Sequence, residues 1–457
     1  MRFFLLFAIM VYGQPPVADT PTRARTPAGL YISWKEHLID DQQLGGVPLR
    51  GADGLQMADL DGDGRPDIVS VHEDSSHVRL AFASASPDKW ELVTLASGKE
   101  AAAAEDASIG DVNGDGLPDI VVACELAHLI YFQNPGPRAA RSGKWPRRIV
   151  GNTRGRGSFI RVFLADLNKD GRLEAVSPNK GEQLPTVNPA DGHPTGSRRK
   201  RTISYFVPPA NPLSSSPWTE HVLAQVEIPI NSQPVDLDAD GDLDIIGGSR
   251  GEQRILFIEN LGGGRFRERR IEPDGPRDRG LTGFMLDFAD FNRDGRLDIE
   301  LSNTTTSLAW LEQPASLERP WTLHPIGSIA PDTTTAVAIA DLNGDGRPDV
   351  VTGGYSQDPR ERDGDNITVA GRIAWFENTG GEWKRHDVSR TKRGMYDAFI
   401  ARDMDGDGDL DLVGTRGNSG NFDGAFWLEQ VRTREPQPAF VPARSRESAK
   451  LALHKTE

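Results

Sequence analysis

The sequence predicts an all-β fold, a seven-bladed β-propeller with four strands in each blade. Three observations lead to this prediction. An acidic nine-residue motif occurs seven times along the 457-residue chain. Two further series accompany it, one of short apolar strands and one of strands that begin with an aromatic residue. Because a four-stranded sheet buries both of its faces only when neighbouring sheets stack on them, the repeats predict a closed ring.

The acidic motif reads D-x-[DN]-x-D-G-x-x-[DE], and its copies start 51 to 70 residues apart. Side-chain oxygens at positions 1, 3 and 5 can surround one cation if the backbone coils tightly, and the glycine at position 6 permits the positive φ that this requires. Position 7 would offer its backbone carbonyl, and position 9 supplies a fourth carboxylate. Such hard oxygen ligands predict calcium as the cofactor, with up to seven ions, one in each blade.

The residues predicted to bind calcium stand at positions 1, 3, 5 and 9 of the seven copies. They are Asp59, Asp61, Asp63, Asp67, Asp111, Asn113, Asp115, Asp119, Asp166, Asn168, Asp170, Glu174, Asp236, Asp238, Asp240, Asp244, Asp290, Asn292, Asp294, Asp298, Asp341, Asn343, Asp345, Asp349, Asp403, Asp405, Asp407 and Asp411. Occupancy of the third copy stays open, because Lys169 lies inside it and Glu174 replaces the last Asp. An EF-hand is excluded, since no copy has Glu at position 12 and β-branched runs follow the motif.

Four strands are predicted in each unit, one before the motif, one after it, a short apolar third strand and an aromatic-led fourth strand. Residues 129–132 exemplify the third strand and residues 90–95 the fourth. The seventh unit lacks a fourth strand, whereas a spare copy at residues 34–39 precedes the first motif. This displacement predicts that the N-terminal strand completes the last blade, a three-plus-one closure of the ring.

The chain ends suggest export. An apolar run at residues 3–12 follows Arg2 and predicts a signal peptide over residues 1–13, and this run is too short to span a membrane. Residues 14–33 are expected to form a linker, residues 34–430 the propeller and residues 431–457 a polar, disordered tail. We therefore expect a secreted or periplasmic protein, a monomer without a membrane span. Cys124 is the single cysteine, which excludes an intrachain disulfide.

The net charge excludes general binding to nucleic acid. The chain has 52 Lys and Arg against 67 Asp and Glu, a formal charge of −15. A nucleic-acid or anionic-membrane binder needs a basic surface instead. The basic run at residues 198–201 lies in a long insertion, and it is expected to form a loop or a contact for acidic glycans.

A ligand is expected on the face opposite the acidic motifs, where the loops vary between units and surround the axis. Their mixture of acids, bases and amides suits a polyhydroxylated ligand, although a merely solvated rim is the alternative. The candidate ligand-binding residues are Asp53, Glu125, Arg161, Asn179, Lys180, Asn231, Arg250, Asn303, Tyr355, Tyr396, Asp397 and Arg416.

The candidate catalytic residues gather around the first blade and the start of the second. They are His72, Glu73, Asp74, His77, Glu105 and Asp106, which could serve as acid and base or bind a second metal. Their spacing matches no specific zinc signature. Other histidines, namely His37, His221, His324 and His386, recur in a W-x-x-H pattern in the fourth strands, which favours structural packing.

The acidic motifs resemble those of the FG-GAP/VCBS repeat family, which includes the propellers of integrin α-subunits and of many secreted bacterial proteins. The resemblance covers roughly residues 34–430 and implies calcium between the first two strands of each blade. Such a resemblance fixes fold better than function. Two functions stay open. One is an exported, calcium-stabilised module for binding or adhesion, with a carbohydrate or protein ligand such as a glycoprotein. The alternative is a carbohydrate-active enzyme of the lyase or dehydratase type, since such enzymes use related propellers.

Overall fold

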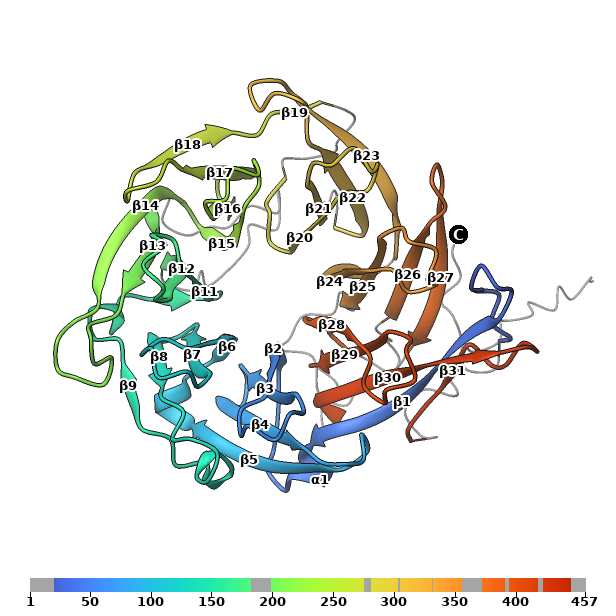
Figure 1. Ribbon diagram of the computed structural model, residues 1–457, viewed down its shortest axis with the longest axis horizontal. Coiled ribbons are helices and arrows are strands. Elements are labelled where there is room, and N and C mark those ends of the chain that lie inside the picture. The colour runs from blue at the N-terminus through green and yellow to red at the C-terminus, as the bar shows by residue number, and fades with distance from the viewer. Residues whose placement is uncertain are drawn as a thin grey trace, which may run out of the picture.

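The computed structural model describes residues 20–181, 199–274, 281–302, 305–330, 332–355, 372–390, 394–417 and 422–444. These residues form seven antiparallel sheets of four main strands, which stand around a common axis (Figure 1). Helical structure in the described part is limited to α1 (Gln42–Gly45) and a few 3-10 turns. The prediction of an all-β, seven-bladed propeller is confirmed.

In most blades the four main strands follow one another in sequence from the axis outwards. Blade 1 contains β2 (Ala52–Ala58), β3 (Asp67–His72), β4 (His77–Ala83) and β5 (Trp90–Ser97). Blade 2 contains β6 (Ala104–Gly110), β7 (Asp119–Cys124), β8 (Leu129–Phe132) and β9 (Arg147–Ile149). Blade 3 contains β10 (Ser158–Phe159), β11 (Phe163–Ala165), β12 (Glu174–Gly181), β13 (Lys200–Val207) and β14 (Thr219–Glu227). Blade 4 contains β15 (Pro229–Val235), β16 (Asp244–Ser249), β17 (Arg254–Asn260) and β18 (Phe266–Arg270). Blade 5 contains β19 (Pro273–Asp274), β20 (Leu286–Ala289), β21 (Asp298–Ser302), β22 (Ser307–Glu312) and β23 (Trp321–Ser328). Blade 6 contains β24 (Thr333–Ala340), β25 (Asp349–Tyr355), β26 (Arg372–Asn378) and β27 (Trp383–Arg390). Blade 7 contains β28 (Phe399–Arg402), β29 (Asp411–Arg416), β30 (Gly424–Thr433), β31 (Phe440–Val441) and the N-terminal strand β1 (Tyr31–Asp41).

The ring closes through the N-terminal strand. Strand β1 pairs antiparallel with β30, from Tyr31 opposite Thr433 to Asp41 opposite Gly424. In Figure 1 the blue β1 lies beside the red β30 in the seventh blade. The predicted three-plus-one closure is therefore confirmed.

The described residues before β1 and after β30 continue the seventh blade, whereas the sequence predicts a linker over residues 14–33 and a disordered tail over residues 431–457. Strand β31 pairs parallel with β1, and Phe440 is buried in the core between blades 6 and 7. The segment before β1 joins it, because the Thr22 N–H donates to the Gln437 carbonyl at 2.8 Å. The described part of the expected tail, up to Arg444, therefore belongs to the seventh blade. Residues 1–13, the expected signal peptide, lie outside the described residues.

Within the described part of the chain, no helix is long and apolar enough to cross a membrane.

Apolar clusters fill the joints between neighbouring blades, and the repeated histidines support the outer strands. His37, His324 and His386 stack on Trp427, Trp310 and Trp375 with ring centroids 4.2 to 4.4 Å apart. Each of these three histidines also contacts a glutamate two residues after its tryptophan. His221 stacks on Tyr205 instead. Their predicted role in packing is confirmed.

An amide at the end of the third strand ties most blades to the preceding one. The Asn134 side chain donates to the carbonyls of Leu60 in blade 1 and Pro118 in its own blade, at 2.8 and 3.1 Å. Four further amides reach back to the preceding blade in the same way, namely Asn260, Gln313, Asn378 and Gln430. These amides link neighbouring blades through hydrogen bonds that repetition alone does not reveal.

A buried ion pair links the closing strand to blade 1. The Arg79 guanidinium donates to both carboxylate oxygens of Asp40, at 2.8 and 3.3 Å, and both side chains are almost fully buried. The residues at the corresponding register of the other third strands carry no charge, being Ile130, Ser204, Leu256, Ala309, Ala374 and Phe426. The joint that closes the ring is thus held by charge as well as by apolar contact.

The joint between blades 5 and 6 contains an unusual buried acid. Glu300 has no exposed surface, and neither carboxylate oxygen has a hydrogen-bond partner among the described residues. The corresponding residue in the six other blades is buried and aliphatic: Val69, Val121, Val176, Ile246, Val351 and Val413. Burying a polar group without a partner costs about 1–3 kcal/mol, so Glu300 should weaken this joint.

We expect Arg79→Ala to lower the free energy of unfolding by about 3 kcal/mol or more, because it leaves the Asp40 carboxylate buried without its partner. Lys35→Ala is the matched control on the same closing strand, since Lys35 forms an exposed pair with Glu429 and should change stability by less than about 1 kcal/mol. Urea denaturation of both variants measures the difference. Equal stabilities for the two variants would contradict a structural role for the buried pair.

We expect Glu300→Val to raise the melting temperature, because it installs the residue type of the sister blades. The reverse change in blade 6, Val351→Glu, should lower it. Differential scanning calorimetry compares both with the unsubstituted protein. A lower melting temperature for Glu300→Val would show that this carboxyl is needed in the joint.

Candidate functional site

Each acidic loop winds around its own carboxylates. In the second loop, Asp111 accepts hydrogen bonds from the N–H groups of Gly114, Asp115 and Gly116, at 2.7 to 3.1 Å. Asn113 and Asp115 accept from the N–H groups two residues further on. The glycine at position 6 has φ between 79° and 91° in all seven loops, as the motif predicts. Positions 1, 3 and 5 are therefore gathered at one place.

Position 4 of the loop is left-handed too, which the motif alone does not indicate. It is glycine in four loops, but Lys169, Ala239 and Arg293 adopt φ of 58° to 62° at this position. A residue with a Cβ pays about 1–2 kcal/mol for this conformation. The winding of the loop is kept even where the local sequence opposes it.

The position-9 carboxylate fastens the loop to the blade. Asp67 accepts from the Leu60 N–H at the start of the loop, at 2.9 Å, and from the Ala83 N–H at the end of the third strand, at 2.8 Å. It has no exposed surface, and this burial raises its pKa to about 6. Burial raises the pKa of the equivalent Asp349 further, to about 8.

The third loop departs from this pattern for a chemical reason. Pro208 stands where the other blades present an N–H to position 9, and proline has none. The longer Glu174 uses one oxygen for the Leu167 N–H and the other for the Asn168 side chain. Lys169 points away to Asp242 of the fourth loop, at 2.6 Å, so its charge does not fill the third loop.

The loops fit the ligand set of a calcium ion. In the first loop one carboxylate oxygen from each of Asp59, Asp61 and Asp67 lies within 4.8 Å of the others. The fourth and seventh loops gather positions 1, 3 and 9 in the same way. Calcium takes six to eight oxygens, and these carboxylates with a backbone carbonyl supply several of them.

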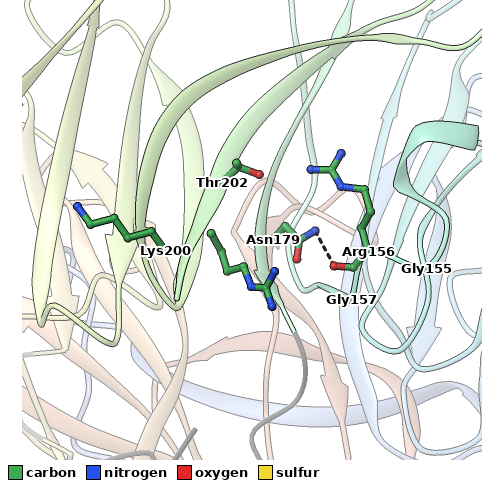
Figure 2. A pocket seen from close by; sticks show the side chains of 7 residues that line it. Gly155, Arg156, Gly157, Asn179, Lys200 and Thr202 are labelled. Carbon is green, nitrogen blue, oxygen red and sulfur yellow. Dashed lines mark hydrogen bonds between the residues drawn. The ribbon is translucent and has the colours of Figure 1, made fainter. Parts of the chain in front are cut away.

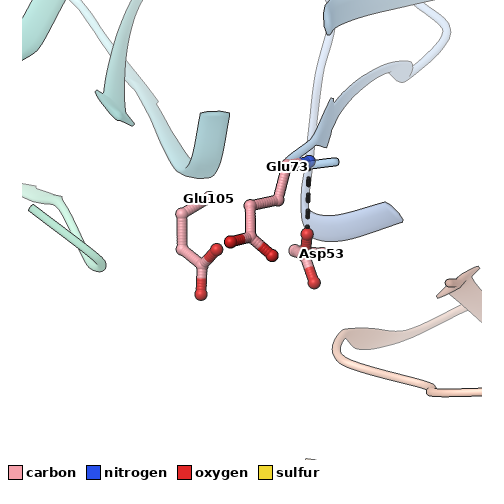
Figure 3. A group of neighbouring side chains, drawn as sticks. All are labelled: Asp53, Glu73 and Glu105. Carbon is pink, nitrogen blue, oxygen red and sulfur yellow. Dashed lines mark hydrogen bonds between the residues drawn. The ribbon is translucent and has the colours of Figure 1, made fainter. Parts of the chain in front are cut away.

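On the opposite face, acidic side chains from two blades converge near the axis. Figure 3 shows Asp53, at the start of β2, with Glu73, which follows β3, and Glu105, in β6. One carboxylate oxygen of each lies within 4.8 Å of the other two. Asp53 accepts from the Glu73 N–H at 3.3 Å. Three residues predicted to bind ligand or to catalyse are therefore brought together.

Burial and mutual repulsion make this cluster electrostatically unfavourable. Burial raises the pKa of Asp53 well above its usual range, and the charges of Glu105, Asp397 and Glu73 raise it further. Glu105 is half-buried, and burial with the charges of Glu125 and Asp397 raises its pKa to about 8. Such shifts are common at functional sites.

Basic side chains from blades 3 and 4 face the acids. Lys180 forms an ion pair with Glu125, and Arg161 lies 3.9 Å from the Asp106 carboxylate. The guanidinium groups of Arg161 and Arg250 each lie 5.3 Å from the centre of the Phe284 ring. Comparing the sequences of the blades did not identify Phe284. The feature that could have identified it is the presence of an aromatic residue just before the first strand of blade 5.

Other candidate residues serve the scaffold. His72 is fully buried, its Nε2 lies 3.1 Å from the Ser70 hydroxyl, and burial lowers its pKa to about 3. It therefore does not share the surroundings of Glu73. The remaining buried candidates contact backbone groups or neighbouring side chains, namely Asp106, Asn179, Asn231, Tyr396 and Arg416.

Three candidates lie at strand ends or in a turn. Asp74 is exposed in the turn after β3, while His77 begins β4 and Tyr355 ends β25. Asn303 lies outside the described residues. The predicted ligand-binding and catalytic residues thus divide into an axial group and a structural group.

A separate recess lies at the edge of blade 3 (Figure 2). Its volume is about 360 Å³, and it is lined by Gly155, Arg156, Gly157, Asn179, Lys200, Arg201 and Thr202. The Arg156 guanidinium is held by Glu220, at 2.5 and 2.9 Å. Lys200 and Arg201 belong to the basic run noted in the sequence, so part of that run lines a recess.

Comparison with known proteins identifies the repeats. The family model for the FG-GAP-like repeat matches residues 59–122, 111–177 and 236–299, and the model for the FG-GAP repeat matches residues 333–373. No curated protein matches the chain significantly.

Similar solved structures share little sequence with this chain. The crystal structure of BBS1N in complex with ARL6DN, soaked with mercury, has 9% identity and a TM-score of 0.46, covering 88% of this chain and 98% of that one. The form soaked with lead has 12% identity and a TM-score of 0.47, covering 87% and 96%. Likeness at this level says nothing about ligands or partners. The matched repeats, which contain six of the seven acidic loops, and the ring that they form show that the chain belongs to the FG-GAP repeat family.

Proposed function

We propose that the protein is an exported, calcium-stabilised binding module whose ligand is polyhydroxylated and binds at the axial face. The supporting observation is the convergence of charged groups from separate blades near the axis. Asp53, Glu73 and Glu105 form the acidic part, and Arg250 with Phe284 forms part of the basic side. A carbohydrate, free or on a glycoprotein, is the ligand class that this chemistry suits.

Each half of the axial face can contact a different part of a sugar. Carboxylates accept hydrogen bonds from hydroxyl groups, while a guanidinium donates to ring oxygens or to an acidic substituent. The Arg250 side chain is exposed, so it can meet a ligand from solvent. The guanidinium groups of Arg161 and Arg250 both lie 5.3 Å from the centre of the Phe284 ring, which brings two sets of donors together on this face.

Calcium in the acidic loops would stabilise the scaffold without taking part in recognition. We expect chelation of calcium to lower the melting temperature of the full chain and calcium addition to restore it. Calcium at 100 times the Kd of one site adds about 2.7 kcal/mol to the free energy of unfolding. Thermal melting with and without chelator measures the change, and an unchanged melting temperature would contradict the proposal.

The fourth loop offers a matched pair of variants for that experiment. Position 1 is Asp in all seven loops, whereas position 3 is Asn in four of them. Asp236→Asn should therefore remove one calcium ion per chain, and Asp238→Asn should keep it. Bound calcium is counted by elemental analysis after equilibrium dialysis.

We expect Arg250→Ala to weaken carbohydrate binding by about tenfold or more, the loss typical of a central contact residue. The control is Arg270→Ala in the outer strand of the same blade, where Arg270 pairs with Glu272. Retention on a panel of neutral and acidic polysaccharides is followed together with product formation. Equal retention of both variants would exclude the axial face, and product formation would indicate a lyase or dehydratase instead.

A further inference from the structure

The acidic cluster on the axial face contains buried oxygens without a donor. Asp53 is 1% exposed, and its Oδ2 accepts the weak 3.3 Å hydrogen bond from Glu73. Its Oδ1 is enclosed and has no hydrogen-bond partner among the described residues, and the same holds for Glu105 Oε2. An enclosed carboxylate oxygen without a partner is costly, and either a proton or a cation between the side chains removes that cost.

The nearby basic side chains do not meet this need. Lys180 is engaged with Glu125, and Arg161 is directed to Asp106 and to the Met285 sulfur, 3.1 Å away. In the part of the chain that the structure describes, no Lys or Arg forms an ion pair with Asp53 or Glu105. A cation from outside the protein would supply this positive charge.

The shape of the cluster suits a small cation. Figure 3 shows the Glu73 and Glu105 carboxylates turned toward one another, with Asp53 beside them. Three carboxylate oxygens within 4.8 Å of one another can contact one ion between them. A ligand set made of carboxylates alone suits Ca²⁺, Mg²⁺ or Mn²⁺ rather than a metal that prefers nitrogen or sulfur.

We propose that Asp53, Glu73 and Glu105 bind a hard divalent cation at the axis, distinct from the cations of the seven acidic loops. The inference rests on the proposed function in one respect, the use of the axial face for the ligand. Three carboxylates leave coordination positions open, so hydroxyl or carboxylate groups of a sugar can complete the shell. The site therefore favours ligands with adjacent oxygen donors, and an acidic group on them can reach Arg250.

Counting bound cations without carbohydrate tests the site directly. The full chain is stripped with chelator, dialysed against Ca²⁺, Mg²⁺ or Mn²⁺ in turn, and analysed for metal per chain. We expect Asp53→Asn/Glu105→Gln to bind one ion fewer than the unsubstituted protein for at least one of the three metals. Asp74→Asn, an exposed carboxylate next to Glu73, is the control and should leave the number unchanged.

A second variant keeps the test usable if the double variant does not fold. Glu105 is half-buried, so Glu105→Gln alone should fold, and we expect its axial cation to bind about tenfold more weakly, because affinity follows the charge of the ligand set. Equal metal numbers and affinities for folded Glu105→Gln and the unsubstituted protein would overturn the inference. Cation binding without polysaccharide retention would contradict the proposed function alone, so the two failures are distinguishable.

Discussion

The buried carboxylate at position 9 of the acidic motif is the contact on which each blade is built. One of its oxygens fixes the start of the loop, and in most blades the other fixes the end of the third strand. In five blades the residue held there is the amide that reaches the preceding blade, as Asn134 reaches Leu60. A chain of hydrogen bonds therefore runs from the acidic loop through one blade into the next. A cation bound to the same carboxylate would reinforce a connection that already exists.

The strands and loops could be predicted because each is local and occurs seven times. The displaced strand at residues 34–39 even revealed how the ring closes. The amides that link blades also recur, two residues after the apolar third-strand run of five units, as in Phe132-Gln133-Asn134 and Phe376-Glu377-Asn378. The sequence does not indicate their partner, because the carbonyl that each amide reaches lies in the preceding blade. Asn134 and Leu60, for example, are 74 residues apart.

The axial site was only partly predictable. Because His72 and Glu73 are adjacent in the sequence, they are expected to act together. Adjacent residues of an extended chain point to opposite faces, however. The His72 side chain lies in the buried polar surroundings of Ser70 and Arg79. Asp53 and Glu105 lie 52 residues apart and meet because they begin the innermost strands of adjacent blades. Comparing the copies indicates which positions vary, whereas only the ring determines which of them meet.

The pairing of β1 with β30 has a consequence for how the protein is made. The first strand leaves the ribosome nearly 400 residues before its partner. During synthesis it has exposed backbone edges and apolar residues such as Trp34, which become buried only in the closed ring. Contacts this distant in sequence form slowly, and an unpaired strand invites association with other chains. The ring can therefore close only after β30 has been synthesised, and until then β1 is open to association with other chains.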